Sequence, residues 1–273
     1  MKSFSVGQLA VWLHPAEGEA IARVMMVHGI CEHSGRHLNT IQALNKLGYE
    51  VVRFDLRGAG RSGGIRQYVE GFADYVQDCV QVYTWICREL SHLPLFVLGH
   101  SLGGLIAIYF ASHYSKALQG LILTAPAYKV GEGVSAFKIA AGRILNRLLP
   151  KLRMPEGIGA PVSRDLKVCQ DYKSDPLCCH TNTVKQGVEI LNAMEVLPEI
   201  AAQVSCPVMI IHGTHDRIIL PVGSFDILKH FASKEKTLHF IPEGFHELHN
   251  DLCKEQFFPL LGIWIQRHLK KRK

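Results

Sequence analysis

Short β-branched and apolar runs alternate along the chain with longer stretches of helical periodicity, and this alternation restricts the fold more than any other feature. It is typical of α/β proteins, in which helices cover both faces of a mainly parallel sheet. The runs that predict parallel strands are Tyr49–Phe54, Leu95–Leu98, Leu121–Thr124, Val208–His212 and Leu238–Ile241. The stretches that predict helices are Phe72–Leu90, Leu105–Tyr114 and Phe257–Leu269.

The first part of the chain carries two further apolar runs, Gln8–Leu13 and Ala22–Val27. Pro15 and Gly18 lie between them, and both residue types favour turns. The pattern therefore predicts that the chain opens with an antiparallel hairpin made of these two strands.

Composition narrows the class of protein. Of the 273 residues, 48% are hydrophobic and 20% are charged, which is enough apolar material for one large globular domain. No window approaches the run of about 18 apolar residues that a membrane-spanning helix needs, and residues 1–11 lack the apolar core of a signal peptide. The eight cysteines show neither metal-ligand spacing nor the density of a disulfide-rich scaffold. We therefore expect a soluble, cytoplasmic protein with reduced thiols.

One segment breaks the alternation of strands and helices. A long stretch separates the strand that ends near Thr124 from the next one, which begins at Val208. This stretch is too long for a plain crossover connection. We therefore expect a core formed by residues 1–128 and 204–273, and an inserted helical cap formed by residues 129–203.

Within the expected cap, apolar residues recur at helical spacing and share one face of a predicted helix. They are Phe137, Ala140, Ala141, Ile144, Leu145, Leu148 and Leu149, whereas Arg143, Arg147 and Lys151 fall on another face. We expect the apolar face to pack on the body of the protein, and transient contact with a membrane surface is the alternative. Part of the net charge of +6 lies in residues 268–273, which we expect to form a solvated helix end.

The sequence Gly99-His100-Ser101-Leu102-Gly103 directly follows a predicted strand and precedes a predicted helix. In that context, the Gly-x-Ser-x-Gly pattern marks a sharp strand-to-helix turn that lifts a nucleophilic serine above the sheet. Glycines are needed beside the serine because side chains there would collide in the strained turn. Ser101 is therefore the candidate nucleophile, and a serine that merely caps a helix is the alternative.

Two backbone N–H groups are candidates for stabilising the oxyanion that forms when a serine attacks a carbonyl group. One belongs to Leu102, at the start of the predicted helix, and the other to Ile30, in the loop after the strand Ala22–Val27. His28 lies in the same loop, and we expect it to brace the backbone and not to act as a base.

A serine is a weak nucleophile at neutral pH until an imidazole accepts its proton and a carboxylate orients that imidazole. Asp216 and His246 each follow a predicted strand, which places them at the carboxyl edge of the sheet. The order serine, aspartate, histidine along the chain is the one that this type of site uses. His249 competes with His246 as the base, and Glu243 and Asp251 are weaker rivals of Asp216.

With these residues in view, the chain resembles the monoacylglycerol lipase and lysophospholipase family of α/β-hydrolases over nearly all of its length. Residues 28–36, His-Gly-Ile-Cys-Glu-His-Ser-Gly-Arg, are similar to that family's His-Gly-x-x-Glu-His-Ser-Gly-Arg loop. Residues 55–62, Asp-Leu-Arg-Gly-Ala-Gly-Arg-Ser, are similar to its Asp-x-Arg-Gly-x-Gly-x-Ser turn. Segments 163–165 and 172–177 of the expected cap also resemble segments of the family's lid.

The resemblance implies an α/β-hydrolase fold, and it places the family's catalytic triad on the serine, aspartate and histidine named above. It also implies that Glu32, Arg36 and His249, together with Tyr172, line a polar pocket for glycerol or another alcohol.

The residues and the resemblance together predict a serine ester hydrolase that cleaves monoacylglycerol to fatty acid and glycerol through an acyl-enzyme on Ser101. A lysophospholipase or broader carboxylesterase is the alternative, because the residues that break an ester do not specify its head group. The chain also departs from the family in its apolar cap residues and at Cys178 and Cys179. A prolyl-type peptidase and a non-catalytic binding protein are weaker alternatives.

The prediction extends to cofactors and partners. We expect no metal, no organic cofactor and no nucleic-acid partner. The expected partners are a single-chain acyl ester and, through the cap, a membrane surface, while the oligomeric state stays open.

Overall fold

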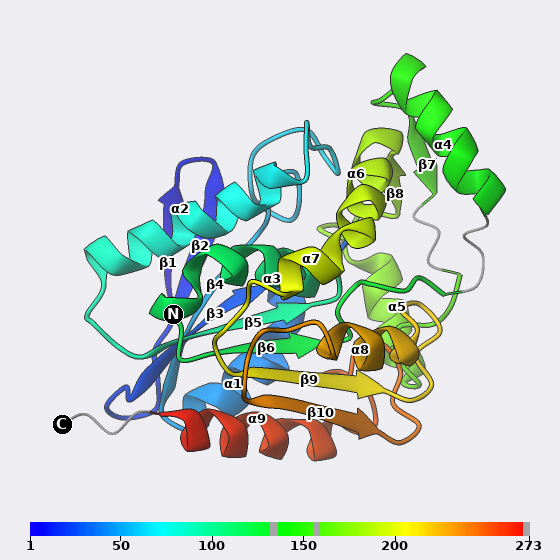
Figure 1. Cartoon of the computed structure of the whole chain (residues 1–273). Helices are drawn as coiled ribbons and strands as arrows, with labels where there is room; N and C mark the ends of the chain where they lie inside the picture. Colours follow the sequence, from blue (N-terminus) through cyan, green and yellow to red (C-terminus); the bar gives the residue numbers. More distant parts are fainter. Residues whose placement is uncertain (132–135, 156–158, 270–273) are drawn as a thin grey trace.

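The computed structural model describes residues 1–131, 136–155 and 159–269, apart from the side chains of residues 136–138 (Figure 1). The side chain of Phe137 and the basic residues 270–273 therefore lie outside the described part. An eight-stranded sheet has the strand order β1-β2-β4-β3-β5-β6-β9-β10, and from β4 onward all neighbours pair in parallel, which confirms the α/β class. The strands are β1 Lys2–Val6, β2 Leu9–His14, β3 Ala22–Val27, β4 Tyr49–Phe54, β5 Leu95–His100, β6 Gly120–Thr124, β9 Val208–Gly213 and β10 Lys236–Ile241.

The predicted hairpin between the second and third of these strands is wrong. The hairpin joins β1 to β2, and β2 then pairs in antiparallel fashion with β4. Strand β3 lies between β4 and β5 and pairs with both in parallel. All six residues of β3 are buried, so this strand needs neighbours on both sides, whereas the mixed burial pattern of β2 suits a place near the edge.

Side chains of the parallel strands alternate between two cores, one on each face of the sheet. Met25 and Val27 of β3 belong to the core under α2, α3, α7 and α8, and Val24 and Met26 belong to the core under α1 and α9 (Figure 1). The helices on the two faces are α1 Leu38–Lys46, α2 Ala73–Glu89, α3 Leu102–Tyr114, α7 Leu197–Ala201, α8 Pro221–Leu228 and α9 Lys254–His268, with short 3-10 helices at Ser34–His37 and Ser115–Ala117. The helices predicted from the sequence are present at α2, α3 and α9.

The long segment between β6 and β9 forms several short elements and not a single crossover helix. A two-stranded antiparallel sheet, β7-β8, lies among its helices. Besides α7, the elements are α4 Ala136–Leu148, β7 Arg153–Pro155, α5 Leu166–Ser174, β8 Thr181–Thr183 and α6 Val184–Glu195. The division of the chain into a core and a cap at residues 129 and 203 stays a prediction.

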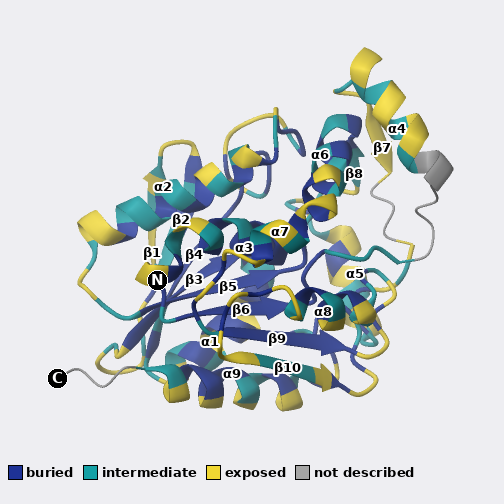
Figure 2. Cartoon of the chain, viewed as in Figure 1, coloured by how far each residue is buried: buried dark blue, intermediate teal, exposed yellow. Residues whose placement is uncertain are grey.

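Helix α4 does not pack as its sequence pattern predicts. Ile144 and Leu148 are 65% and 73% exposed, and Leu149 is 54% exposed (Figure 2). The side of α4 that faces α6 includes Gly142, where a Cβ atom would lie 4.0 Å from the side chain of Val188, and a solvent-exposed ion pair between Arg143 and Glu195 also joins the two helices. Packing of the apolar face on the body of the protein is therefore the wrong expectation for these three apolar residues. Among the described residues, no helix combines the length and the apolar character that crossing a bilayer requires.

Candidate active site

Ser101 lies in a sharp turn between β5 and α3, with φ 53° and ψ −119°, a backbone conformation that is strained for any residue with a side chain. The flanking glycines make this turn sterically feasible. A Cβ atom at Gly99 would lie 2.3 Å from the carbonyl oxygen of Gly103, and one at Gly103 would lie 2.2 Å from the carbonyl oxygen of Val27. The strained turn, which an ordinary helix-capping serine does not need, favours Ser101 as a nucleophile.

Asp216 and His246 come from the loops after β9 and β10, and the structure brings their side chains together. The Nδ1–H of His246 donates to Oδ2 of Asp216 at 2.6 Å. Oδ1 of Asp216 accepts from the backbone N–H groups of Ile218 and Ile219 at 2.8 and 3.0 Å. Because the carboxylate holds the proton of His246 on Nδ1, Nε2 is left with the lone pair that a general base requires.

The pKa values of Asp216 and His246 support the same roles. Burial alone would raise the pKa of Asp216, but the opposing charge of His246 and hydrogen bonds from His212 and His246 hold it well below its ordinary value. Burial alone would lower the pKa of His246, but the carboxylate of Asp216 raises it above its ordinary value. Asp216 therefore stays ionised at neutral pH and increases the basicity of His246.

The direction of the His246 shift predicts how hydrolysis depends on pH. A general base must be neutral, so kcat/KM is expected to fall as the pH drops through the pKa of His246 in the free enzyme. Since that pKa is raised, the midpoint of the acid limb should lie above the ordinary histidine value of about 6.5. Initial rates on a soluble short-chain ester between pH 5 and pH 9 would measure it. A midpoint clearly below about 6.5 would contradict the geometry of the pair.

The nucleophile and the base are not hydrogen-bonded to each other. Among the hydrogen bonds of the described residues, none joins Ser101 to His246. The ring of His246 lies 4.8 Å, centroid to centroid, from the ring of His100, the residue before the nucleophile. Catalytic hydrogen bonds are often long without substrate and tighten in the complex.

The loop after β3 lies directly against the nucleophile. A Cβ atom at Gly29 would lie 3.2 Å from Cβ of Ser101, so only glycine fits the loop here without displacement. Ile30 follows in this loop, and Leu102 is the first residue of α3, where N–H groups have no acceptor within the helix. Both predicted oxyanion donors therefore belong to segments that adjoin Ser101.

His28 braces this loop, as the sequence predicts. Its ring is buried, Nδ1–H donates to the carbonyl of Gly29 at 2.7 Å, and Nε2 accepts from the N–H of Leu56 at 3.0 Å. Burial lowers the pKa of His28, which keeps the ring neutral and suited to one donated and one accepted bond.

The residues predicted to bind the alcohol form a buried polar cluster, to which the segment after β3 contributes Glu32 and Arg36 and the loop after β10 contributes His249. Oε1 of Glu32 accepts from the N–H of Gly29 at 2.6 Å and lies 3.0 Å from Nε2 of His37. Arg36 pairs with Glu247 at 2.6 Å and more loosely with Glu32, whose Oε2 lies 3.8 Å from Nε of Arg36. Three buried atoms, Glu32 Oε2, Arg36 Nε and His249 Nε2, have no hydrogen-bond partner among the described residues. Buried polar atoms are rarely left in this state, which makes them candidates for binding a polar ligand.

Tyr172 also belongs to this cluster, since the Arg36 guanidinium lies 5.0 Å from the centre of its ring. Tyr172 lies on α5, so the polar cluster joins the segment between β6 and β9 to the loop after β3.

Among the described residues, no hydrogen bond or ion pair joins Glu243 or Asp251 to His246. Glu243 and Asp251 both pair with Arg164, at 2.7 and 3.3 Å. The ring of His249 stacks on the ring of His37 with centroids 4.3 Å apart, and no described carboxylate lies within ion-pair distance of it. Burial lowers the pKa of His249 well below its ordinary value. The geometry therefore favours His246 as the base and leaves His249 as a neutral residue of the polar cluster.

His212 is a residue that sequence reasoning missed. Its Nε2 lies 3.1 Å from Oδ2 of Asp216 and 3.0 Å from the carbonyl oxygen of Ile219, and its Nδ1 lies 2.7 Å from Oγ of Ser224. Two acceptors at Nε2 place the ring proton there, so His212 donates to the same carboxylate oxygen that holds His246. The only sequence signal was a histidine in the strand that leads to Asp216.

Loss of this hydrogen bond should affect catalysis through Asp216. His212→Leu is expected to lower kcat/KM by about tenfold or more, because a hydrogen bond to a charged group contributes about 1.5–3 kcal/mol. His212→Gln keeps an N–H donor and should recover most of that loss. Rates measured across pH on a soluble ester would separate the two variants. Equal losses in both would mean that His212 matters only for packing.

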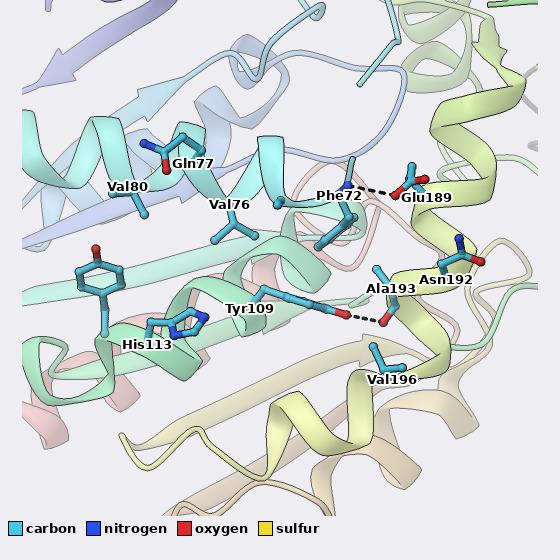
Figure 3. A pocket seen from close by; sticks show the side chains of 12 residues that line it. Phe72, Val76, Gln77, Val80, Tyr109, His113, Glu189, Asn192, Ala193 and Val196 are labelled. Carbon is cyan, nitrogen blue, oxygen red and sulfur yellow. Dashed lines mark hydrogen bonds between the residues drawn. The ribbon is translucent and has the colours of Figure 1, made fainter. Parts of the chain in front are cut away.

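A separate groove runs over the helices α2, α3 and α6, away from the loops that carry the triad (Figure 3). It has a volume of about 840 Å³, and its walls are mainly apolar. Tyr109 crosses it and donates from its hydroxyl to the carbonyl of Ala193 at 2.8 Å. None of the predicted site residues lines this groove.

A mainly parallel sheet with a strained serine turn, followed in the chain by an aspartate–histidine pair, defines an α/β-hydrolase. Residues 18–253 match the family described as serine aminopeptidase, S33, and the chain belongs to this family. Its relatives within this family include monoacylglycerol lipases, which makes it an enzyme of the lipase and esterase class within the α/β-hydrolases.

Named relatives and solved structures agree with this assignment. The chain is 30% identical to a monoacylglycerol lipase of Mycolicibacterium smegmatis, over 95% of this chain and 92% of that one. It is also 30% identical to the human monoglyceride lipase, over 92% of this chain and 84% of that one. The crystal structure of the Paleococcus ferrophilus monoacylglycerol lipase has a TM-score of 0.86 at 27% identity and covers 94% of this chain and 99% of its own.

Proposed function

We propose that this chain hydrolyses a single-chain acyl ester, with monoacylglycerol as its preferred substrate. The observation that carries the proposal is a set of three buried atoms without a hydrogen-bond partner among the described residues, Glu32 Oε2, Arg36 Nε and His249 Nε2, of which the first two lie 3.8 Å apart as a loose ion pair. A carboxylate oxygen accepts and a guanidinium N–H donates, and the hydroxyl groups of glycerol do both. The names of the relatives support the same substrate class.

In the proposed reaction, the hydroxyl oxygen of Ser101 attacks the ester carbonyl while its proton moves to Nε2 of His246. The carbonyl oxygen becomes an oxyanion, which the N–H groups of Ile30 and Leu102 stabilise. When the intermediate collapses, the ester C–O bond breaks and His246 returns the proton to the leaving glycerol oxygen. Water then attacks the acyl-enzyme by the same route and releases the fatty acid. Asp216 stabilises the imidazolium formed in each half-reaction.

A substrate panel tests this proposal. Purified protein should be assayed with monoacylglycerols of several chain lengths, lysophosphatidylcholine and short p-nitrophenyl esters. The proposal predicts the highest kcat/KM on a monoacylglycerol. A higher value on lysophosphatidylcholine would replace it with the lysophospholipase alternative, and equal values on all esters would indicate a general carboxylesterase.

We further propose that α4 lets the enzyme rest on a membrane surface while it takes up substrate. Ile144 and Leu148 expose large apolar side chains on this helix, and apolar Leu152 and Met154 just after it are 41% and 47% exposed. Arg147 on the same helix is exposed and cationic, which suits an anionic lipid surface. Burial of such side chains in the lipid boundary would supply most of the binding energy.

This membrane proposal predicts a difference between substrates. Replacing Ile144 and Leu148 together by serine should slow hydrolysis of long-chain monoacylglycerol in vesicles by at least about tenfold, because each large side chain contributes about 1.5–3 kcal/mol when it is fully buried. Hydrolysis of a soluble short-chain ester should stay unchanged. Ile263→Ser on α9, where the side chain is 67% exposed, is the matched control. Equal losses on both substrates would remove the membrane proposal.

A further inference from the structure

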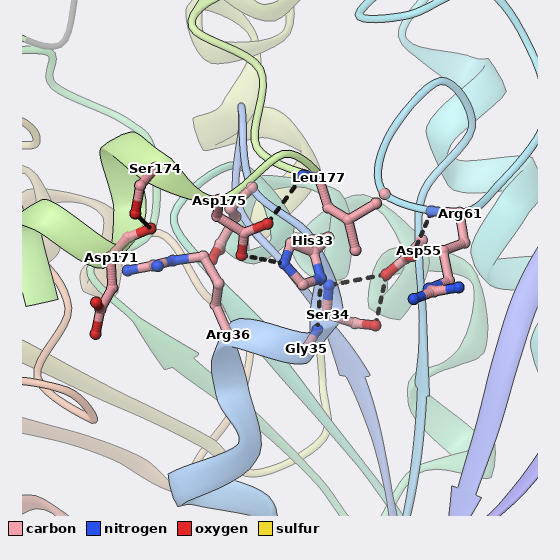
Figure 4. Close-up of polar contacts among 12 residues, drawn as sticks. His33, Ser34, Gly35, Arg36, Asp55, Arg61, Asp171, Ser174, Asp175 and Leu177 are labelled. Carbon is pink, nitrogen blue, oxygen red and sulfur yellow. Dashed lines mark hydrogen bonds and ion pairs between the residues drawn. The ribbon is translucent and has the colours of Figure 1, made fainter.

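A pocket of about 670 Å³ lies between the N-terminal hairpin and the loop of residues 33–36, and two arginines line it. Arg53 comes from β4 and is only 7% exposed, whereas Arg61 comes from the loop after β4 and is exposed. Figure 4 shows Asp55 between Ser34 and Arg61, and both Asp55 and Arg61 line this pocket. The pocket contains none of the candidate catalytic residues.

The guanidinium of Arg53 differs from the other buried guanidinium groups that the structure describes. Arg23 pairs with Glu50 at 2.5 Å, and Arg36 pairs with Glu247 at 2.6 Å. No carboxylate within the described residues lies at ion-pair distance from Arg53. Burying a charge without an opposite charge nearby costs free energy, so the missing carboxylate partner of Arg53 needs a physical explanation.

The contacts of Arg53 leave part of its donor set unused. Nε donates to Nε2 of His14 at 3.0 Å, and one terminal nitrogen donates to Oγ of Ser34 at 2.7 Å. Among the described residues, the other terminal nitrogen donates only to the sulfur of Met1 at 3.9 Å, and a thioether is a weak acceptor. The guanidinium also packs on Trp12, 3.9 Å from the ring centre.

Asp55, the nearby acid, is already committed to other donors. Its Oδ1 accepts from the backbone N–H and the hydroxyl of Ser34, at 2.9 and 2.6 Å, and its Oδ2 accepts from the backbone N–H of Arg61 at 2.8 Å (Figure 4). Burial lowers the pKa of Arg53 to about 10; the charge of Asp55 raises it and that of Arg61 lowers it. The surroundings thus destabilise the cation, and an anion in the pocket would stabilise it.

We propose that this pocket binds the phosphate group of a small soluble compound, with Arg53 and Arg61 as its cationic contacts. Guanidinium groups match the oxygen geometry of phosphate, and two of them suit a dianion. The buried guanidinium of Arg53 supplies a fixed fork of N–H groups, and the exposed Arg61 closes over the ligand from the solvent side. The site is distinct from the polar cluster of Glu32, Arg36 and His249.

Titration calorimetry with inorganic phosphate, at constant ionic strength balanced with sodium chloride, tests the proposal on the full chain. Wild type should show saturable binding of one phosphate. Arg53→Met should weaken that binding by at least about tenfold, because hydrogen bonds to charged groups are lost. Arg61→Gln, at an exposed position, should weaken it as well. Arg88→Gln, on the exposed last turn of α2, should bind phosphate as wild type does.

Arg53 is buried, so a loss of phosphate binding in Arg53→Met has to be distinguished from a failure of that variant to fold. Arg53→Lys keeps the charge and most of the apolar stem but lacks the fork, and it should fold and bind phosphate more weakly than wild type. Circular dichroism and esterase activity would verify that each variant is folded. No saturable binding by wild type, or equal binding by wild type and folded Arg53 variants, would overturn the proposal. Arg53-dependent binding to phosphatidic acid vesicles without binding of free phosphate would also overturn it, in favour of a lipid head group.

Discussion

Ser101→Ala is expected to lower kcat for ester hydrolysis by about a million-fold, the scale seen when the nucleophile of a serine hydrolase is removed. Without the hydroxyl oxygen no acyl-enzyme forms, and neither Asp216 nor His246 replaces it. The turn itself should persist, because alanine keeps a Cβ in the same strained conformation and the flanking glycines are unchanged. Turnover of a short p-nitrophenyl ester by freshly purified variant protein measures the effect.

A matched serine on the same helix controls for general effects of the substitution. Ser112 lies on α3, and within the described part of the chain its hydroxyl donates only to the carbonyl of Tyr109, about one turn earlier. Ser112→Ala should therefore retain most of the activity. If the Ser101 variant kept even a tenth of wild-type turnover, another nucleophile would have to be responsible.

His246→Ala is the second change with a very large expected effect, again about a million-fold in kcat, because the base and the nucleophile act as one unit. A hydrogen bond of 2.6 Å to Asp216 orients the imidazole of His246, and the one other described imidazole that bonds to Asp216 is that of His212, at 3.1 Å. Single-turnover acylation, followed as the burst of p-nitrophenol, isolates the step that should be lost. Asp216→Asn should cost less, about ten-thousand-fold, since the imidazole stays in place but in the wrong tautomer.

His249→Ala separates the two histidines. Its ring belongs to the polar cluster, so the expected result is a higher KM for monoacylglycerol with a much smaller change in the acylation rate of a p-nitrophenyl ester. If His249→Ala abolished acylation while His246→Ala turned over normally, the base would have been assigned to the wrong residue.

Local sequence signals predicted the strands that are buried on both faces. The bounds of β3 and β4 agree with their apolar runs, because such strands contrast sharply with the polar turns around them. The order of the strands in the sheet could not be predicted from any local segment of the sequence. The insertion of β4 between β2 and β3 depends on pairing across the whole sheet, and the short spacing of β2 and β3 in the chain favoured a hairpin that the sheet does not contain.

Helix α4 shows a second limit of pattern reasoning. Its amphipathic spacing predicted the helix, but spacing does not say which face meets the protein. The half-buried side that includes Gly142 and Leu145 faces α6, and Ile144 and Leu148 stay exposed. Which face of α4 packs on the protein depends on residues that are distant in the sequence, and no local window contains them.

The residues of the candidate site were also predicted only in part. The turn around Ser101 carries its own sequence signature, and Asp216 and His246 follow from their places after strands. His212 and Glu247 were missed, because their importance arises from contacts with Asp216 and Arg36 that only the folded chain creates. Glu247 has no motif that distinguishes it from a surface carboxylate.

Covalent labelling by a fluorophosphonate tests the central claim most directly, since the probe phosphonylates an activated serine oxygen and releases fluoride. Intact-mass and peptide analysis of labelled wild type should show one adduct, on the peptide that contains Ser101. Ser101→Ala should not be labelled, and His246→Ala should be labelled far more slowly, because the base that removes the serine proton is missing. An adduct on another residue, or equal labelling of wild type and Ser101→Ala, would contradict the assignment of Ser101 as the nucleophile.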